Sequence, residues 1–201
     1  MAQPRRTGTV TALRERPQGQ VEVELDGAPW RLVPADAVVR AELRVGRRLD
    51  RETARTLARE LRRARAVGIA VQALRYRDRS RRSLEERLAS RAVRPDAGEA
   101  ALEALERAGI VDDARVAGTR ARALAERGYG DAAIRFDLER QGISGELVEG
   151  AVAALEPERA RARRLVGLRG AGPRTARWLA GRGFDAEAVE EALGAPFAAD
   201  G

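Results

Sequence analysis

Apolar and polar residues alternate along the first part of the chain in a way that is typical of β-strands. From Val21 to Leu25, valine and leucine alternate with glutamate, which predicts a strand with one buried face. Asp26-Gly27 predicts a tight hairpin turn after this strand, and Pro17-Gln18-Gly19 predicts the turn before it. We therefore expect a small β-hairpin unit over residues 1–49, too short to be very stable by itself.

From Asp50 onward, the apolar residues recur at helical spacing. Asp50 is a favourable N-cap residue, and Leu57 and Leu61 continue one face of the helix that follows it. We expect an Arg-rich connecting helix over residues 50–69, bending or stopping at Gly68 because glycine weakens a helix interior. A second helical segment, Ile69–Tyr76, is expected to follow.

The remainder of the chain repeats one helical pattern three times. Windows Leu84–Leu102, Ile134–Val152 and Thr175–Leu193 each contain a short helix, a turn with glycine or alanine, one apolar residue and a second helix. Ser144 and Asp185 are placed to cap two of the second helices, and Pro95 occupies the first turn of the other. The equivalent apolar positions are Leu88, Leu138 and Leu179; Val93, Ile143 and Phe184; and Leu102, Val152 and Leu193.

A further helix is expected before each window, at Ile69–Tyr76, Ala114–Arg127 and Arg159–Leu168. Each group of three helices would have only a small core, so consecutive groups are expected to pack end to end. The sequence thus predicts a mainly α-helical protein. Its three-helix repeats would cover residues 70–113, 114–156 and 157–201, after the small N-terminal β unit.

The composition argues against most kinds of catalytic centre. The chain of 201 residues has no cysteine and no histidine, and all 38 of its basic residues are arginine. We therefore do not expect disulfides, a soft-metal site, histidine acid–base catalysis or lysine Schiff-base chemistry. Asp112 and Asp113 could suggest a metal site, but an acid at Asp113 also suits the start of the next helix. We expect no enzyme activity, no cofactor and no metal.

The distribution of charge points to a polyanionic or acidic partner. The net charge is +7, and residues 1–69 carry 15 arginines against 9 acids. Residues 75–94 carry eight arginines against three acids, and residues 95–113 carry one against six.

No apolar run of 18 residues exists, so no membrane span is expected. With neither a signal peptide nor cysteines, we expect a cytoplasmic protein. We also expect it to be a monomer.

Two clusters of arginine are candidate binding sites for phosphates or carboxylates, through bidentate contacts. The first is formed by Arg81, Arg82, Arg87 and Arg91; the alternative is a solvated face paired with Glu85 and Glu86. The second is formed by Arg122, Arg127, Arg135 and Arg140 around Tyr129. Tyr129 lies between two glycines, and either packs in the turn of its own repeat or stacks on a base.

The stretch Gly167–Ala176 contains Gly170-Ala171-Gly172-Pro173 and offers a second interpretation. It is similar to a helix-hairpin-helix motif, in which a Gly-x-Gly turn offers backbone N–H groups to a DNA phosphate. In the repeat interpretation it is the loop between two helices of the third copy. The two interpretations are compatible, since a loop can also contact phosphate.

Several segments, taken in order and spacing, resemble the RecX family of RecA regulators. In the second copy these are Ile110–Asp113, Arg127–Gly130 and Leu138–Ile143. In the other copies they are Ala73–Tyr76, Arg79–Leu88 and Gly181–Asp185. The chain departs from the family pattern at Val116, where phenylalanine is usual, at Gly98 inside an expected helix, and in the Gly-rich stretch Gly167–Pro173.

The resemblance implies tandem three-helix repeats that form an elongated, curved array. It also implies a non-enzymatic regulator that binds RecA–DNA filaments along their groove and suppresses RecA activity in recombination, DNA repair and the SOS response. RecA is then the expected partner, together with single- or double-stranded DNA. The expected contact residues are Arg75, Arg81, Arg82, Arg87, Arg91, Arg122, Arg127, Tyr129, Arg135 and Arg140. The alternative is a sequence-independent DNA-binding protein that acts without RecA.

Overall fold

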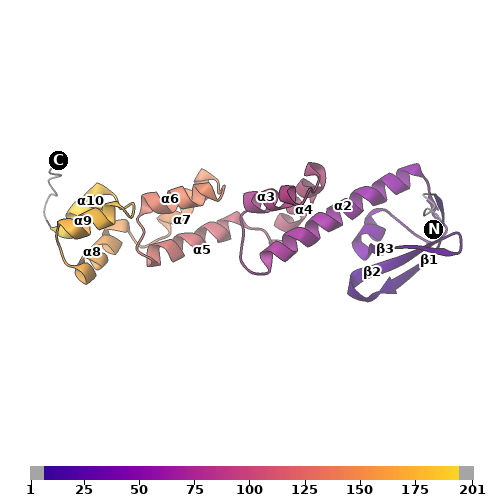
Figure 1. The fold of residues 1–201 in the computed structure, drawn as a ribbon, viewed down its shortest axis with the longest axis horizontal. Coiled ribbons are helices and arrows are strands. Elements are labelled where there is room, and N and C mark those ends of the chain that lie inside the picture. Colours follow the sequence, from indigo (N-terminus) through magenta and orange to yellow (C-terminus); the bar gives the residue numbers. More distant parts are fainter. Residues whose placement is uncertain (1–6, 195–201) are drawn as a thin grey trace. The chain divides into compact units, whose positions relative to one another are not determined.

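The computed structural model describes residues 7–194 and divides into two compact units. Unit 1 comprises residues up to Arg77 together with Leu84–Ala108, and unit 2 comprises Asp78–Ser83 together with the residues from Gly109 onward. A strand-rich N-terminal part is followed by a series of helices, as the hydrophobic pattern predicts (Figure 1). The mainly helical fold with a small N-terminal β unit is confirmed.

A four-stranded antiparallel sheet of order β3-β2-β1-β4 begins unit 1. Its strands are β1 (Gly8–Arg16), β2 (Gln20–Leu25), β3 (Ala28–Pro34) and β4 (Arg48–Leu49). Asp26 and Gly27 both have positive φ, at 49° and 82°, as the tightest hairpin turns require. Helix α1 (Ala35–Arg40) and strand β4 complete a unit that the sequence pattern described only as a hairpin.

Alternation along β2 builds the core of this sheet. Val21, Val23 and Leu25 are buried, and the glutamates between them are partly exposed. Leu57 of helix α2 (Arg51–Leu74) belongs to the same buried cluster. The hairpin is therefore stabilised by a helical cover, which supplies the apolar contacts that so small a sheet lacks by itself.

Helix α2 begins as predicted and continues further than predicted. The Asp50 carboxylate accepts a hydrogen bond from the Thr53 backbone N–H at 2.8 Å, which satisfies a donor at the helix N-terminus. This bond is the main cause that lowers the pKa of Asp50 below its ordinary value. The expected stop at Gly68 is wrong, because α2 runs through it: Ala66 and Ala70 are fully buried on one face, and Gly68 lies on the exposed face.

The three predicted windows share one backbone device at the turn between their helices. The N–H of the apolar residue after each turn donates to the carbonyl five residues earlier, from Val93 to Leu88, Ile143 to Leu138 and Phe184 to Leu179. The residue before each of these donors has positive φ: 53° at Ala92, 75° at Gly142 and 80° at Gly183. These are the bonds of a glycine-type helix C-cap, so the repeat is present in the backbone as well as in the apolar pattern.

Helices of the first copy lie in unit 1 apart from the start of α3. They are α2, α3 (Arg81–Ser90) and α4 (Pro95–Arg107), with α4 packed against α2. Gly98, which departs from the family pattern inside an expected helix, lies buried inside α4. A β-carbon there would meet Leu88 Cδ1 at 3.7 Å, which is an ordinary contact, so the site has room for a methyl group.

The second and third copies lie in unit 2, and each has its own core. The second consists of α5 (Asp113–Glu126), α6 (Asp131–Arg140) and α7 (Gly145–Ala153). The third consists of α8 (Glu158–Arg169), α9 (Pro173–Ala180) and α10 (Ala186–Leu193). The first helix of each copy packs against its third helix. Ile134 and Leu138 are fully buried in one core and Leu179 in the other.

Within residues 7–194, no helix is both long enough and apolar enough to cross a lipid bilayer.

Candidate functional site

The predicted arginines differ in what their side chains contact. Arg75, Arg87 and Arg91 lie exposed in unit 1 and form no ion pair with any residue between 7 and 194. Arg81 and Arg82 belong to unit 2, in the first turn of α3. The first predicted cluster is thus split between two compact units, and Arg87 and Arg91 are its members in unit 1.

Arg81 and Arg82 take part in holding the N-terminus of α3 within unit 2. The backbone N–H of Arg81 donates to the Asp113 carboxylate at 2.8 Å. The methylene groups of Arg82 fill the space against Gly142, where a β-carbon would collide with them. Beside them, the buried Ser80 hydroxyl donates to the Gln141 carbonyl at 2.6 Å. The segment therefore has a structural role that the charge pattern did not reveal.

Asp112 and Asp113 both act at helix N-termini. The Asp112 carboxylate accepts a hydrogen bond from the Arg115 N–H at 3.0 Å and so caps α5. Asp113 is the first residue of α5, as expected. No group of three or more carboxylates that could hold a metal ion occurs among the described residues.

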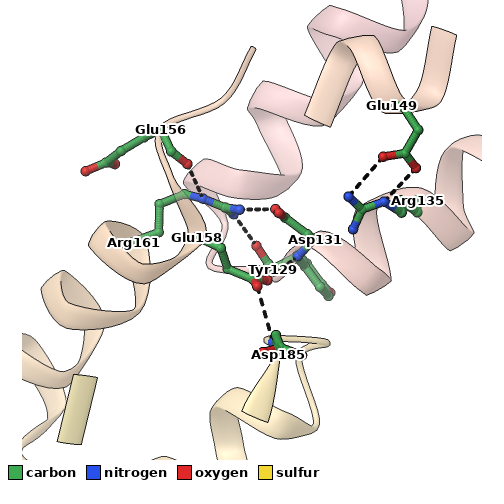
Figure 2. A network of polar contacts seen from close by, with 8 residues as sticks. All are labelled: Tyr129, Asp131, Arg135, Glu149, Glu156, Glu158, Arg161 and Asp185. Carbon is green, nitrogen blue, oxygen red and sulfur yellow. Dashed lines mark hydrogen bonds and ion pairs between the residues drawn. The ribbon is translucent and has the colours of Figure 1, made fainter. Parts of the chain in front are cut away.

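Arg135 is bound in an ion pair with Glu149 of α7. Its Nε and Nη2 atoms donate to the two carboxylate oxygens at 2.8 and 3.1 Å (Figure 2). The hydrogen bond from Arg135 is the main cause that lowers the pKa of Glu149, and the same bond raises the pKa of Arg135. Arg135 therefore links α6 to α7. An external partner would have to compete with Glu149 for its guanidinium.

Arg140 and Arg122 remain exposed on the second copy. The Arg140 guanidinium lies 5.9 Å from the centre of the Phe136 ring, which is itself 61% exposed. Arg122 is exposed on α5 and forms no ion pair within residues 7–194. These two side chains are free to meet a partner, in contrast to Arg135.

A buried arginine that the sequence patterns did not single out lies between the second and third copies. Arg161 of α8 is 2% exposed, and donates to the Tyr129 carbonyl at 2.8 Å, the Glu156 carbonyl at 3.0 Å and the Asp131 carboxylate (Figure 2). Its guanidinium also lies 5.7 Å from the ring centre of Phe184. Counted from the first residue of each helix, Arg161 occupies the position of Val116 in α5. That mismatch between copies is the signal that could have identified it.

The contact between these copies continues along the backbone. The N–H of Gly130 donates to the Arg182 carbonyl at 2.9 Å, and the N–H of Ala132 donates to the Gly183 carbonyl at 3.1 Å. Glu158 accepts hydrogen bonds from the N–H of Asp131 at 2.5 Å and from that of Asp185 at 3.3 Å (Figure 2). The start of α6 is therefore capped by groups from the next copy.

Tyr129 lies in a row of arginines and aromatic rings at the same boundary. Arg127 and Arg182 lie 5.8 and 4.7 Å from the centre of its ring. Arg182 also lies 4.8 Å from the centre of Trp178, and Arg169 lies 4.1 Å from it. We call these five residues the Arg–aromatic row. Charge patterning identified Arg127 and Tyr129 but missed the members from the third copy, because they lie more than 35 residues further along the chain.

The Gly-rich stretch forms the loop between α8 and α9, as in the repeat interpretation. Gly170 and Gly172 have φ of 83° and 152°, values that favour glycine. The Thr175 hydroxyl closes the loop by donating to the Gly170 carbonyl at 2.8 Å. Arg169, a member of the Arg–aromatic row, directly precedes the loop.

Comparison with known proteins gives one consistent family. A domain described as "RecX, second three-helix domain" matches residues 112–152. A "Regulatory protein RecX" of Xanthomonas oryzae pv. oryzae is 36% identical over 138 residues, covering 64% of this chain and 84% of the relative. The protein of the same description from Stenotrophomonas maltophilia is 34% identical over 138 residues, covering 64% of this chain and 82% of the relative.

Two solved structures share the fold. A crystal structure of a regulatory protein RecX has a TM-score of 0.80 at 20% identity, covering 92% of this chain and 98% of that chain. That of RecX from Lactobacillus salivarius has a TM-score of 0.58 at 17% identity, covering 66% and 95%. At these identities the two structures support the fold alone.

Proposed function

The chain belongs to the RecX family of regulatory proteins, and on that premise we propose that it binds RecA nucleoprotein filaments and lowers RecA activity in recombination and DNA repair. The observation that carries the proposal is the threefold recurrence of one helical unit, with the same C-cap bond at each turn. Repeated units suit a filament, because each unit can contact a successive, identical subunit.

Exposed arginines without an intramolecular carboxylate partner are the proposed contact residues. Six of the predicted residues meet this description within residues 7–194: Arg75, Arg87, Arg91, Arg122, Arg127 and Arg140. Arg135 does not, because Glu149 holds it. An arginine that is already paired must break that pair before it can bind a partner, so the unpaired residues should dominate the affinity.

The direct test is RecA-driven ATP hydrolysis and strand exchange on single-stranded DNA, with this protein titrated in. We expect both rates to fall at stoichiometric amounts. The double variant R87Q/R91Q should weaken the inhibition of RecA several-fold. The matched control R159Q/R163Q removes the same charge from arginines that are ion-paired with Glu187 and Glu191, and should have little effect. Unchanged RecA rates with the unmodified protein would overturn the proposal.

The second candidate is a sequence-independent DNA-binding protein that acts without RecA. The net charge of +7 and the exposed arginines favour it. Tight binding to bare DNA with a steep salt dependence, combined with no effect on RecA, would select this candidate. A nuclease assay with magnesium gives a simple test of the expectation that neither role involves catalysis, and no cleavage should be seen.

A further inference from the structure

We infer that the Arg–aromatic row is a binding site for the phosphate backbone of nucleic acid, built jointly by the second and third copies. The row is Arg127, Tyr129, Arg182, Trp178 and Arg169. Its members come from the end of α5, the following turn, the end of α8, and α9 with its turn. This inference does not depend on RecA, because the ligand is bare DNA.

The charge of the row is not neutralised inside the described part of the molecule. Arg127, Arg169 and Arg182 form no ion pair within residues 7–194, although Arg182 donates to the Arg127 carbonyl at 3.0 Å. The other arginines of α8 show a different pattern. Arg159 and Arg163 pair with carboxylates of α10, and Arg164 pairs with Glu156. Of the α8 arginines, Arg169 alone among the described residues has an aromatic ring and no carboxylate as its neighbour.

The aromatic rings hold the guanidinium groups in place before a ligand arrives. A cation over an aromatic face is stabilised by about 0.5–1 kcal/mol at exposed sites. Arg182 is only partly exposed and is further fixed by its hydrogen bond to the Arg127 carbonyl. Side chains that are already ordered lose less conformational entropy on binding, which favours a preformed site. A guanidinium that lies over a ring can still donate from its N–H groups, whose planar arrangement matches the geometry of a phosphate.

The same stacking argues against recognition of bases. Each of the two rings already has two guanidinium groups within 6 Å of its centre. Trp178 also packs against the Gly128 turn, where a β-carbon would meet its Cη2 atom at 3.4 Å. A base would have to displace an arginine in order to stack. The row should therefore bind phosphates irrespective of sequence, and Tyr129 should not act as a base-stacking platform.

The test is a fluorescence-anisotropy titration of the full chain with labelled oligo(dT), at several salt concentrations. The variant R127Q/R169Q should bind more weakly. Its plot of log affinity against log salt should be shallower by about 1.4, since each phosphate contact to a single strand contributes about 0.7. The control R159Q/R163Q, with the same change of charge, should keep the slope of the unmodified protein. Equal losses in both variants, or no loss in R127Q/R169Q, would overturn the inference.

Three further arms identify the ligand. An oligonucleotide of abasic sites should bind within about twofold of oligo(dT), and a large loss without bases would instead support stacking and contradict the inference. The variant R127K/R169K should restore the salt slope but only part of the affinity, because lysine lacks the planar fork. Polyglutamate at the same charge concentration should compete poorly, and equal competition would mean that an acidic protein is the ligand. Unchanged circular dichroism shows that a variant is folded.

Discussion

In unit 2, the N-termini of α3 and α6, the second helices of the first two copies, each contact the following copy. The two contacts share one feature and differ in others. At the start of α3, the Arg81 N–H donates to Asp113, the first residue of α5. At the start of α6, the Asp131 N–H donates to Glu158, the first residue of α8. In both, a carboxylate from the next copy satisfies a helix N-terminus and complements its dipole.

The turn that packs against each helix start is held differently. At α3, the Ser80 hydroxyl donates to the Gln141 carbonyl, so a side chain makes the link. At α6, Gly130 uses its own N–H to reach the Arg182 carbonyl, so two backbones lie in direct contact. Arg161 then fills the space that Val116 occupies in the preceding copy. The comparison shows that the carboxylate cap at a helix start can be kept while the link to the adjacent turn and the neighbouring side chain both change.

The largest effect is expected when the ion pair between Asp131 and Arg161 at the start of α6 is broken. Replacing Asp131 by alanine leaves Arg161 buried without its carboxylate, which should destabilise unit 2 by about 3 kcal/mol or more. The measurement is urea unfolding followed by Trp178 fluorescence in a Trp30→Phe background. The double variant D131A/R161M should recover most of the loss. Alanine at Asp137, which pairs with the partly exposed Arg120, should cost about 1 kcal/mol or less.

The next effect tests the close approach of the two backbones at α6. A β-carbon on Gly130 would collide with the carbonyl group of Gly183, so Gly130→Ala should destabilise unit 2 by about 1–3 kcal/mol. The control is Gly145→Ala in α7, where a β-carbon meets nothing within 4 Å. That control should be neutral or stabilising in the same unfolding assay. Equal stability of the two variants would show that the contact is looser than described.

A smaller effect is expected at the start of α3. Ser80 is 1% exposed; its hydroxyl donates to the Gln141 carbonyl and accepts from the Ser83 N–H at 3.2 Å. Ser80→Ala removes both bonds and should cost about 1–2 kcal/mol. The matched control is Ser90→Ala, since the Ser90 hydroxyl is exposed and donates only to the Arg87 carbonyl. A loss at Ser80 no larger than at Ser90 would mean that this side-chain link is dispensable.

The smallest effect concerns an ion pair within one copy. Because the pKa of Glu149 is lowered in the folded protein, the stability it contributes is present above its unfolded pKa. That contribution is lost as the pH falls through the lowered folded value. The difference in stability between the unmodified protein and Glu149→Gln should therefore be larger at pH 7 than at pH 3. A difference that does not change with pH would contradict the pairing with Arg135.

Local patterns in the sequence were sufficient for most of the fold. Alternation along β2, the Asp50 cap and the turn at Gly142 each depend on residues that are close in the chain, and each was predictable. Gly68 was misjudged because the cost of a glycine is a local property, while the burial of Ala66 and Ala70 is a tertiary one.

The candidate site was less predictable than the fold, for the same reason. Arg135 and Arg140 look alike in the sequence, yet only Arg135 meets a carboxylate from another helix. Arg127 was predicted, but Arg182 stacks with the same tyrosine and comes from 55 residues later. Which arginines are exposed and unpaired depends on helix packing, and the charge pattern along the chain does not contain that information.

The capping of α6 by the third copy also has a consequence for synthesis. The acceptors for the start of α6 lie at Glu158, Arg182 and Gly183, all made after the helix itself. The last buried residue of the second core is Val152. At about 5–20 residues per second, translation needs about 2–6 seconds to pass from Val152 to Gly183. During that interval the second copy can fold its own core while the start of α6 still hydrogen-bonds to water. The start of α6 therefore gains its final hydrogen bonds only after most of the third copy has been synthesised.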